Sequence, residues 1–122
     1  MPGTSETPFC CTLFLANIHQ KKLTLNFIEI ISQFENRTSK DLKFELLEQH
    51  YMPYVFGSGF AAYRIKGRNL RIDFDGRDRA VEVSITPKHL KYPVNEWTSI
   101  FSGSVEDFFI RGLNEVKAKL EQ

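Results

Sequence analysis

Residues 60–86 read FAAYRIKGRNLRIDFDGRDRAVEVSIT, and this stretch decides the fold. It contains three runs in which apolar and polar side chains alternate, and a glycine follows each of the first two runs. The apolar positions of the three runs are Ala61, Tyr63, Ile65, Leu70, Ile72, Phe74, Val81, Val83 and Ile85. Alternation with period two is typical of antiparallel strands that pack one face on a core and leave the other in water. The stretch therefore predicts a β-meander.

The two predicted turns share the dipeptide Gly-Arg, at positions 67–68 and 76–77. Glycine as the first residue of a two-residue loop suits a type II′ turn, which needs a positive φ at that position. This turn type pairs apolar residues with apolar residues across both hairpins, and a slip of one residue would turn them all toward water. The register contains one mismatch, Phe74 opposite Arg79, which indicates that the second turn opens into a longer loop.

The same register gathers basic side chains on the water-facing side of the sheet. Arg64 is predicted opposite Arg71, with Lys66 beside them and Arg68 in the turn. Like charges that face each other cost a few tenths to ~1 kcal/mol unless an anion neutralises them. Glu82, predicted opposite Arg71 on the third strand, fits such an internal pair, and this favours a solvated face of mixed charge. The functional interpretation is a basic patch that binds an acidic protein surface or a phosphate backbone.

Amphipathic helices are predicted before and after the meander. Asn26 with Glu29 resembles a capping box at the start of the first helix, and Ser104 with Asp107 resembles one at the start of the last. The apolar face of the first helix is formed by Leu23, Phe27, Ile30, Ile31 and Phe34. The apolar face of the last is formed by Val105, Phe108, Phe109, Leu113, Val116 and Leu120. Both faces have helical spacing and are expected to pack on the core.

Three other segments have less distinct patterns. Residues 9–15 are an apolar run that fits either a strand or a buried helical turn, and periodicity does not decide between them. Residues 41–49 fit a strand by alternation and also fit a helix that begins at Ser39, and we predict the helix. The aromatic-rich connector after the meander has Pro93 at a first helical position and Gly103 as a stop, which predicts a short helix.

Length and composition fit a single cytoplasmic domain. The chain has 122 residues, of which 42% are hydrophobic, so one core can form without a disulfide or a metal. Cys10 and Cys11 are adjacent and are poorly placed to bond to each other. The first residues lack the basic group of a signal peptide, and no run reaches the ~20 apolar residues of a membrane helix. We expect a flexible tail at residues 1–8 and one domain at residues 9–122.

The predicted fold class of that domain is α+β. An antiparallel β-meander of three or four strands packs against a C-terminal amphipathic helix and against one or two N-terminal helices. This arrangement buries the apolar face of the sheet under the helices and leaves the charged face in water.

No motif in the sequence assigns a chemistry. The triplet Gly57-Ser58-Gly59 matches part of a dinucleotide-binding loop, but the residues after it alternate as a strand where that loop needs a helix. The three histidines lack the spacing of metal ligands, and a cysteine paired with a distant histidine is an arrangement that any chain with both residues offers. We therefore assign no catalytic residue, metal or cofactor. An enzyme with a site built from scattered residues stays open as a third interpretation.

The candidate binding residues are the basic patch and the aromatics of the loops. Five aromatic residues lie outside the alternating runs, where they serve either as core under loops or as anchors of a recognition surface. These five are Tyr51, Tyr54, Phe56, Tyr92 and Trp97. From both groups we predict a partner-binding set of Arg64, Lys66, Arg68, Arg71, Tyr54, Tyr92 and Trp97.

These features favour a small, non-catalytic binding module whose partner is another protein. Inhibitor and immunity proteins share this build in outline, which is an analogy of fold alone. The alternative is single-stranded nucleic acid bound through the basic sheet face, although Tyr63 and Phe74 are predicted to point into the core. The formal charge of +1, from 16 basic and 15 acidic groups, gives no overall attraction to phosphate. The sequence leaves a homodimer open and predicts no membrane contact.

Overall fold

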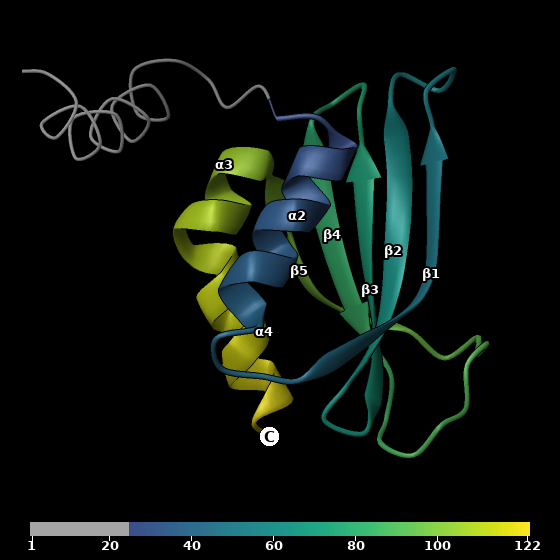
Figure 1. Ribbon diagram of the computed structural model, residues 1–122, viewed down its shortest axis with the longest axis vertical. Helices are drawn as coiled ribbons and strands as arrows, with labels where there is room; N and C mark the ends of the chain where they lie inside the picture. The colour runs from purple at the N-terminus through teal and green to yellow at the C-terminus, as the bar shows by residue number, and fades with distance from the viewer. Residues whose placement is uncertain (1–24) are drawn as a thin grey trace, which may run out of the picture.

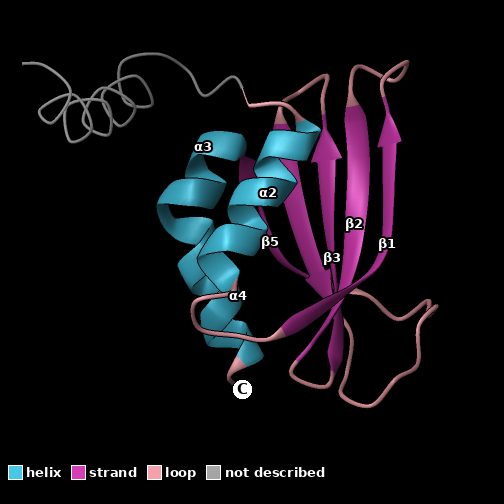
Figure 2. Cartoon of the chain, in the orientation of Figure 1, coloured by secondary structure: helices cyan, strands magenta, loops and turns pink. Residues whose placement is uncertain are grey.

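The computed structural model describes residues 25–122, which form an α+β fold around a five-stranded antiparallel sheet. The strands follow one another in chain order, as in a simple meander. Helices cover one face of the sheet (Figure 1), and Figure 2 separates them from the strands by colour. The elements are α2 (Phe27–Thr38), β1 (Phe44–Met52), β2 (Ser58–Ile65), β3 (Arg68–Asp75), β4 (Ala80–Ile85), β5 (Thr98–Ser104), α3 (Val105–Asp107), η1 (Phe108–Gly112) and α4 (Leu113–Leu120).

The core lies between the helices and the sheet, and it contains the apolar residues that the alternating pattern selected. All nine apolar positions of residues 60–86 are buried. Tyr63 is fully buried, and its hydroxyl donates a hydrogen bond of 2.9 Å to Glu35 of α2. Phe34 of α2 packs on both Tyr63 and Phe108, with ring centroids 5.2 and 6.3 Å apart. The predicted meander and its inward face are confirmed.

Both predicted helix starts are confirmed. The Asn26 side chain accepts a hydrogen bond of 2.9 Å from the Glu29 backbone N–H, and the Glu29 side chain accepts one from the Asn26 backbone N–H. Ser104 accepts a hydrogen bond of 3.0 Å from the Asp107 backbone N–H. The C-terminal helical segment runs on through a π-helical turn, η1, to Leu120. The predicted apolar faces are buried except that Phe109 is half-buried, and Leu23 lies outside the described residues.

The two outer strands correct the sequence-based prediction of three or four strands. Residues 44–52 form the edge strand β1, so the predicted helix at residues 41–49 is wrong. Residues 98–104 form the other edge strand, β5, so the predicted helix that ends at Gly103 is wrong. An edge strand has one neighbour and buries few side chains, so its apolar pattern is weak and pairing decides its conformation. Residues 1–8 and 9–15 and both cysteines lie outside the described part of the chain.

The register of the meander differs by two residues from the prediction in both hairpins. The first turn is formed by Lys66 and Gly67, both with positive φ (53° and 75°), as in a type I′ turn. Tyr63 therefore pairs with Leu70. The second connection is a four-residue loop, residues 76–79, which confirms the predicted opening of that turn. A shift of two residues keeps every side chain on its own face, so the apolar residues still meet one another.

A long loop, residues 86–97, partly covers the face of the sheet that the helices leave open. Asn69 of β3 donates a hydrogen bond of 2.9 Å from its side chain to the carbonyl oxygen of Leu90 in this loop. The backbone N–H of His89 donates one of 2.9 Å to the carbonyl oxygen of Gly67. Asn69 is fully buried beside this loop, although its position on β3 points away from the helices. None of the helices within residues 25–122 is long and apolar enough to span a membrane.

Candidate functional site

The open face of the sheet carries a group of charged and aromatic side chains around Arg71. The Arg71 guanidinium lies over the ring of Phe60, 4.0 Å from its centroid. Its Nε donates hydrogen bonds of 3.0 Å to both carboxylate oxygens of Asp73, two residues further along β3. Burial is the main cause of a raised pKa of the Asp73 carboxyl, which the Arg71 guanidinium partly offsets. Arg71 is thus satisfied within the protein.

Tyr92 connects the long loop to β1 on the same face. Its hydroxyl donates a short hydrogen bond to Glu48, and His50 pairs with the other oxygen of that carboxylate at 2.8 Å. The pKa of the Glu48 carboxyl is lowered, mainly by the hydrogen bond from Tyr92 and next by the hydrogen bond from His50. The pKa of Tyr92 is raised to about 12, mainly by burial and next by its hydrogen bond to Glu48. These contacts hold the loop on the sheet, so Tyr92 has a structural partner already.

The predicted basic patch does not form as the sequence-based register placed it. Arg64 lies opposite Asn69 on one side and Glu45 on the other, and Arg71 lies opposite Ala62. The predicted facing pairs of Arg71 with Arg64 and with Glu82 are therefore wrong. Both predictions depended on the type II′ turns, which the observed I′ turn and four-residue loop replace.

The other two basic residues of the predicted patch lie at the end of the sheet where α4 finishes. Lys66, in the β2–β3 turn, forms an ion pair of 3.2 Å with Glu121. Arg68 shares its side of β3 with Leu70, so it lies on the helix-covered face, opposite to Arg71. The four basic residues thus occupy three different surroundings.

A more coherent surface lies at the tip of the β1–β2 hairpin. Seven large apolar side chains are exposed among the described residues, and four of them lie at this tip, within residues 51–56. We call these four, Tyr51, Tyr54, Val55 and Phe56, the hairpin tip. Tyr54 is 85% exposed and Phe56 is 67% exposed. Exposed aromatic residues that are grouped in this way are typical of binding surfaces, whereas scattered ones are ordinary.

The hairpin tip is held by contacts on both sides. Tyr51 stacks on Phe27 of α2 with ring centroids 5.9 Å apart. On the other side the backbone N–H of Gly76, in the β3–β4 loop, donates a hydrogen bond of 2.9 Å to the Ser58 hydroxyl. A Cβ atom at residue 76 would clash with the carbonyl oxygen of Phe56, so the two loops are in close backbone contact. The exposed aromatics therefore project from an ordered base.

Phe56 has a backbone conformation that large side chains seldom adopt. Its φ is 57°, in the left-handed region that favours glycine and asparagine. The ring stays largely exposed, and the Arg77 guanidinium lies over it, 5.7 Å from the ring centroid. A strained backbone that presents an exposed aromatic ring points to a role outside the fold.

Trp97, the remaining predicted residue, is half-buried in the connector. Its indole N–H donates a hydrogen bond of 3.1 Å to the carbonyl oxygen of Val94. Trp97 and Tyr92 thus fit the interpretation of aromatics that pack under loops, whereas Tyr54 fits the interpretation of an exposed anchor. The structure exposes Tyr51 and Phe56 as well as Tyr54, and the predicted set omits the first two. Tyr51 and Phe56 lie outside the alternating runs, which marks them in the sequence as possible surface residues. Whether they are exposed depends on the tertiary structure.

Within residues 25–122 no group of three or more His, Cys, Asp or Glu residues is arranged to hold a metal ion. Comparison of the chain with known protein families, with curated proteins and with solved structures finds no match.

Proposed function

We propose that this protein is a non-catalytic binding module that recognises another protein through the hairpin tip. The observation that carries the proposal is the exposure of both Tyr54 and Phe56 on one loop, whose backbone packs against Gly76. Aromatic side chains are frequent hot spots of protein interfaces, because they bury a large area at a small cost in conformational entropy. A loop that is ordered before binding lowers that cost further.

The shape of the hairpin tip favours a partner with an apolar pocket. The connection between β1 and β2 lies at one end of the sheet (Figure 1), and Tyr54 and Phe56 within it are exposed. Projecting rings bury their area best in a concave surface that is lined by apolar side chains. The partner that fits this surface is a folded protein with such a pocket near its surface.

The charge around the hairpin tip favours a protein over a nucleic acid. The adjoining loop carries Asp75 and Asp78 together with Arg77 and Arg79, so its charges balance. Binding to a phosphate backbone needs an excess of basic groups, which release counterions when they bind. On the open sheet face Arg71 is already paired with Asp73. The nucleic-acid alternative therefore receives less support.

A photocrosslinking phenylalanine analogue in place of Tyr54 tests the proposal directly. The modified protein is irradiated in extract from the source cell, and the crosslinked protein is identified and purified. The matched control carries the same analogue at Ile110, which is 63% exposed on the C-terminal helical segment, away from the hairpin tip. We expect position 54 to crosslink a specific protein that position 110 does not crosslink.

Calorimetry with the purified partner then measures how much each aromatic ring contributes to the binding affinity. Tyr54→Ala and Phe56→Ala are each expected to weaken binding about 30-fold, the effect of a hot spot worth ~2 kcal/mol. Ile110→Ala should leave the affinity unchanged. Crosslinks to nucleic acid at position 54, equal crosslinking at both positions, or unchanged affinity in both alanine variants would each refute the proposal.

A further inference from the structure

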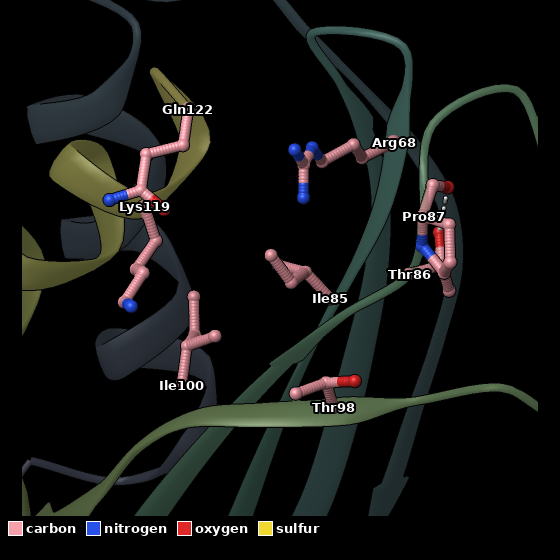
Figure 3. A pocket seen from close by; sticks show the side chains of 8 residues that line it. All are labelled: Arg68, Ile85, Thr86, Pro87, Thr98, Ile100, Lys119 and Gln122. Carbon is pink, nitrogen blue, oxygen red and sulfur yellow. Dashed lines mark hydrogen bonds between the residues drawn. The ribbon is translucent and has the colours of Figure 1, made fainter.

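A pocket opens between the end of α4 and the sheet, far from the hairpin tip. Its volume is about 270 Å³, and residues from β3, β4, β5 and the C-terminal end of the chain surround it (Figure 3). The lining residues are Arg68, Ile85, Thr86, Pro87, Thr98, Ile100, Lys119 and Gln122. Arg68 is the first residue of β3 and lies on its inward side. The next two residues on that side, Leu70 and Ile72, belong to the core.

The pocket contains two basic groups and no acidic one. Arg68 extends from β3 into the space in front of α4, and the side chain of Lys119 runs from α4 toward Ile100 (Figure 3). Among the described residues Arg68 and Lys119 form no hydrogen bond or ion pair through their side chains, and the Nε atom of Arg68 is buried without a partner. Burying part of a guanidinium without an acceptor is unfavourable, so an anion bound beside Arg68 would stabilise it.

Two basic side chains between α2 and the C-terminal helical segment have partners within the protein. Arg37 of α2 donates a hydrogen bond of 3.2 Å to the carbonyl oxygen of Phe109. Lys117, two residues before Lys119 on α4, pairs with Asp41 at 2.7 Å. At the rim of the pocket Glu121 is already paired with Lys66. Arg68 differs from these residues, because its Nε atom is buried and has no acceptor among the described residues.

We propose that the pocket binds a small organic oxyanion, a carboxylate or a phosphate monoester, that carries a short apolar group. The planar guanidinium of Arg68 suits two parallel hydrogen bonds to such an oxyanion, and Lys119 adds a second positive charge. Ile85, Pro87 and Ile100 form an apolar wall for the rest of the ligand. A pocket of about 270 Å³ is at the small end of ligand sites and suits a small ligand.

Titration of ¹⁵N-labelled protein with benzoate, phenyl phosphate and inorganic phosphate tests this proposal. Each probe is added up to about 20 mM, where a millimolar site approaches saturation. We expect saturable shifts of the backbone amides of Ile85, Thr86, Thr98 and Lys119 with the two aromatic anions. Inorganic phosphate should bind about tenfold more weakly, because it leaves the apolar wall uncovered. Comparison of benzoate with phenyl phosphate identifies which oxyanion the pocket prefers.

Two variants and a control separate the pocket from general charge. Arg68→Gln is expected to weaken binding at least tenfold, the loss of a charged, bidentate contact. Arg68→Lys keeps the charge without the planar fork and should fall between Arg68→Gln and the wild type. Lys91→Gln, in the exposed long loop, should bind as the wild type does. The spectra themselves show whether each variant is folded.

The proposal would be overturned by the absence of saturable shifts at these amides with all three probes, or by equal affinity in Arg68→Gln and the wild type. It is independent of the hairpin tip. Tyr54→Ala should bind the anions normally, so failure of one proposal leaves the other standing.

Discussion

The β2–β3 turn and the β3–β4 loop contain the same dipeptide, Gly-Arg, but they connect their strands in different ways. In the first, Lys66 and Gly67 form a tight two-residue turn, and Arg68 already belongs to β3. In the second, four residues from Gly76 onward form the loop, and the residue with positive φ is Arg79. The same pair of residues therefore occupies different positions in the two connections.

The surroundings of the two glycines explain the difference. A Cβ at Gly67 would have no neighbour within 4 Å, so that turn is shaped by its own residues and by the twist of the strands. Gly76 is packed against the backbone of Phe56. Its loop is also tied to the C-terminal helical segment, because the backbone N–H of Val105 donates a hydrogen bond of 3.2 Å to the carbonyl oxygen of Arg79. One turn is local, and the other depends on contacts between distant segments.

The comparison predicts its largest effect for Gly76→Ala. The new methyl group would meet the carbonyl oxygen of Phe56, which cannot move without the hairpin tip. We expect a loss of about 3 kcal/mol in the free energy of unfolding, as for an overpacked site against backbone. Urea denaturation measures it. A loss below ~1 kcal/mol would show that the two loops separate easily and that the hairpin tip is not held in place.

Gly67→Ala is the matched change in the local turn. Here the cost comes from the left-handed backbone at φ 75°, since no atom is in the way. The expected loss is about 1 kcal/mol, and Gly67→Asn should lose less because asparagine adopts this conformation more readily. The same denaturation experiment compares all three variants. If Gly67→Ala cost as much as Gly76→Ala, the distinction between a local and a tertiary turn would be wrong.

Arg64→Glu should have the smallest effect, and its sign distinguishes the two registers. In the observed register residue 64 faces Glu45, so a glutamate there creates a repulsion and destabilises by a few tenths to ~1 kcal/mol. In the register of type II′ turns the same change would face Arg71 and would be stabilising. Melts at low and high salt measure this, and the loss should shrink as salt screens the charges. A gain in stability would mean that the observed register is wrong.

Some features of the candidate site are visible in the local sequence, and others depend on the tertiary structure. That Tyr51, Tyr54 and Phe56 lie outside the alternating runs is visible in the sequence. Whether such residues are core or surface depends on what packs on them, and the structure buries Trp97 and Tyr92 in part while it exposes Tyr54. The place of Arg68 in a pocket likewise follows from the register, which brings its strand position under the end of α4.

The sequence by itself determined the meander, the inward set of each central strand, and the starts of both helices. These features depend on periodicity and on contacts between residues three positions apart, as between Asn26 and Glu29, so a short window of sequence contains them. The tertiary structure alone decided the register, the edge strands and the place of each charge. A shift of two residues leaves the alternating pattern unchanged, and an edge strand such as β1 buries too little to reveal its pairing. In both cases the local sequence fits two conformations equally well, and the packing of distant segments selects one of them.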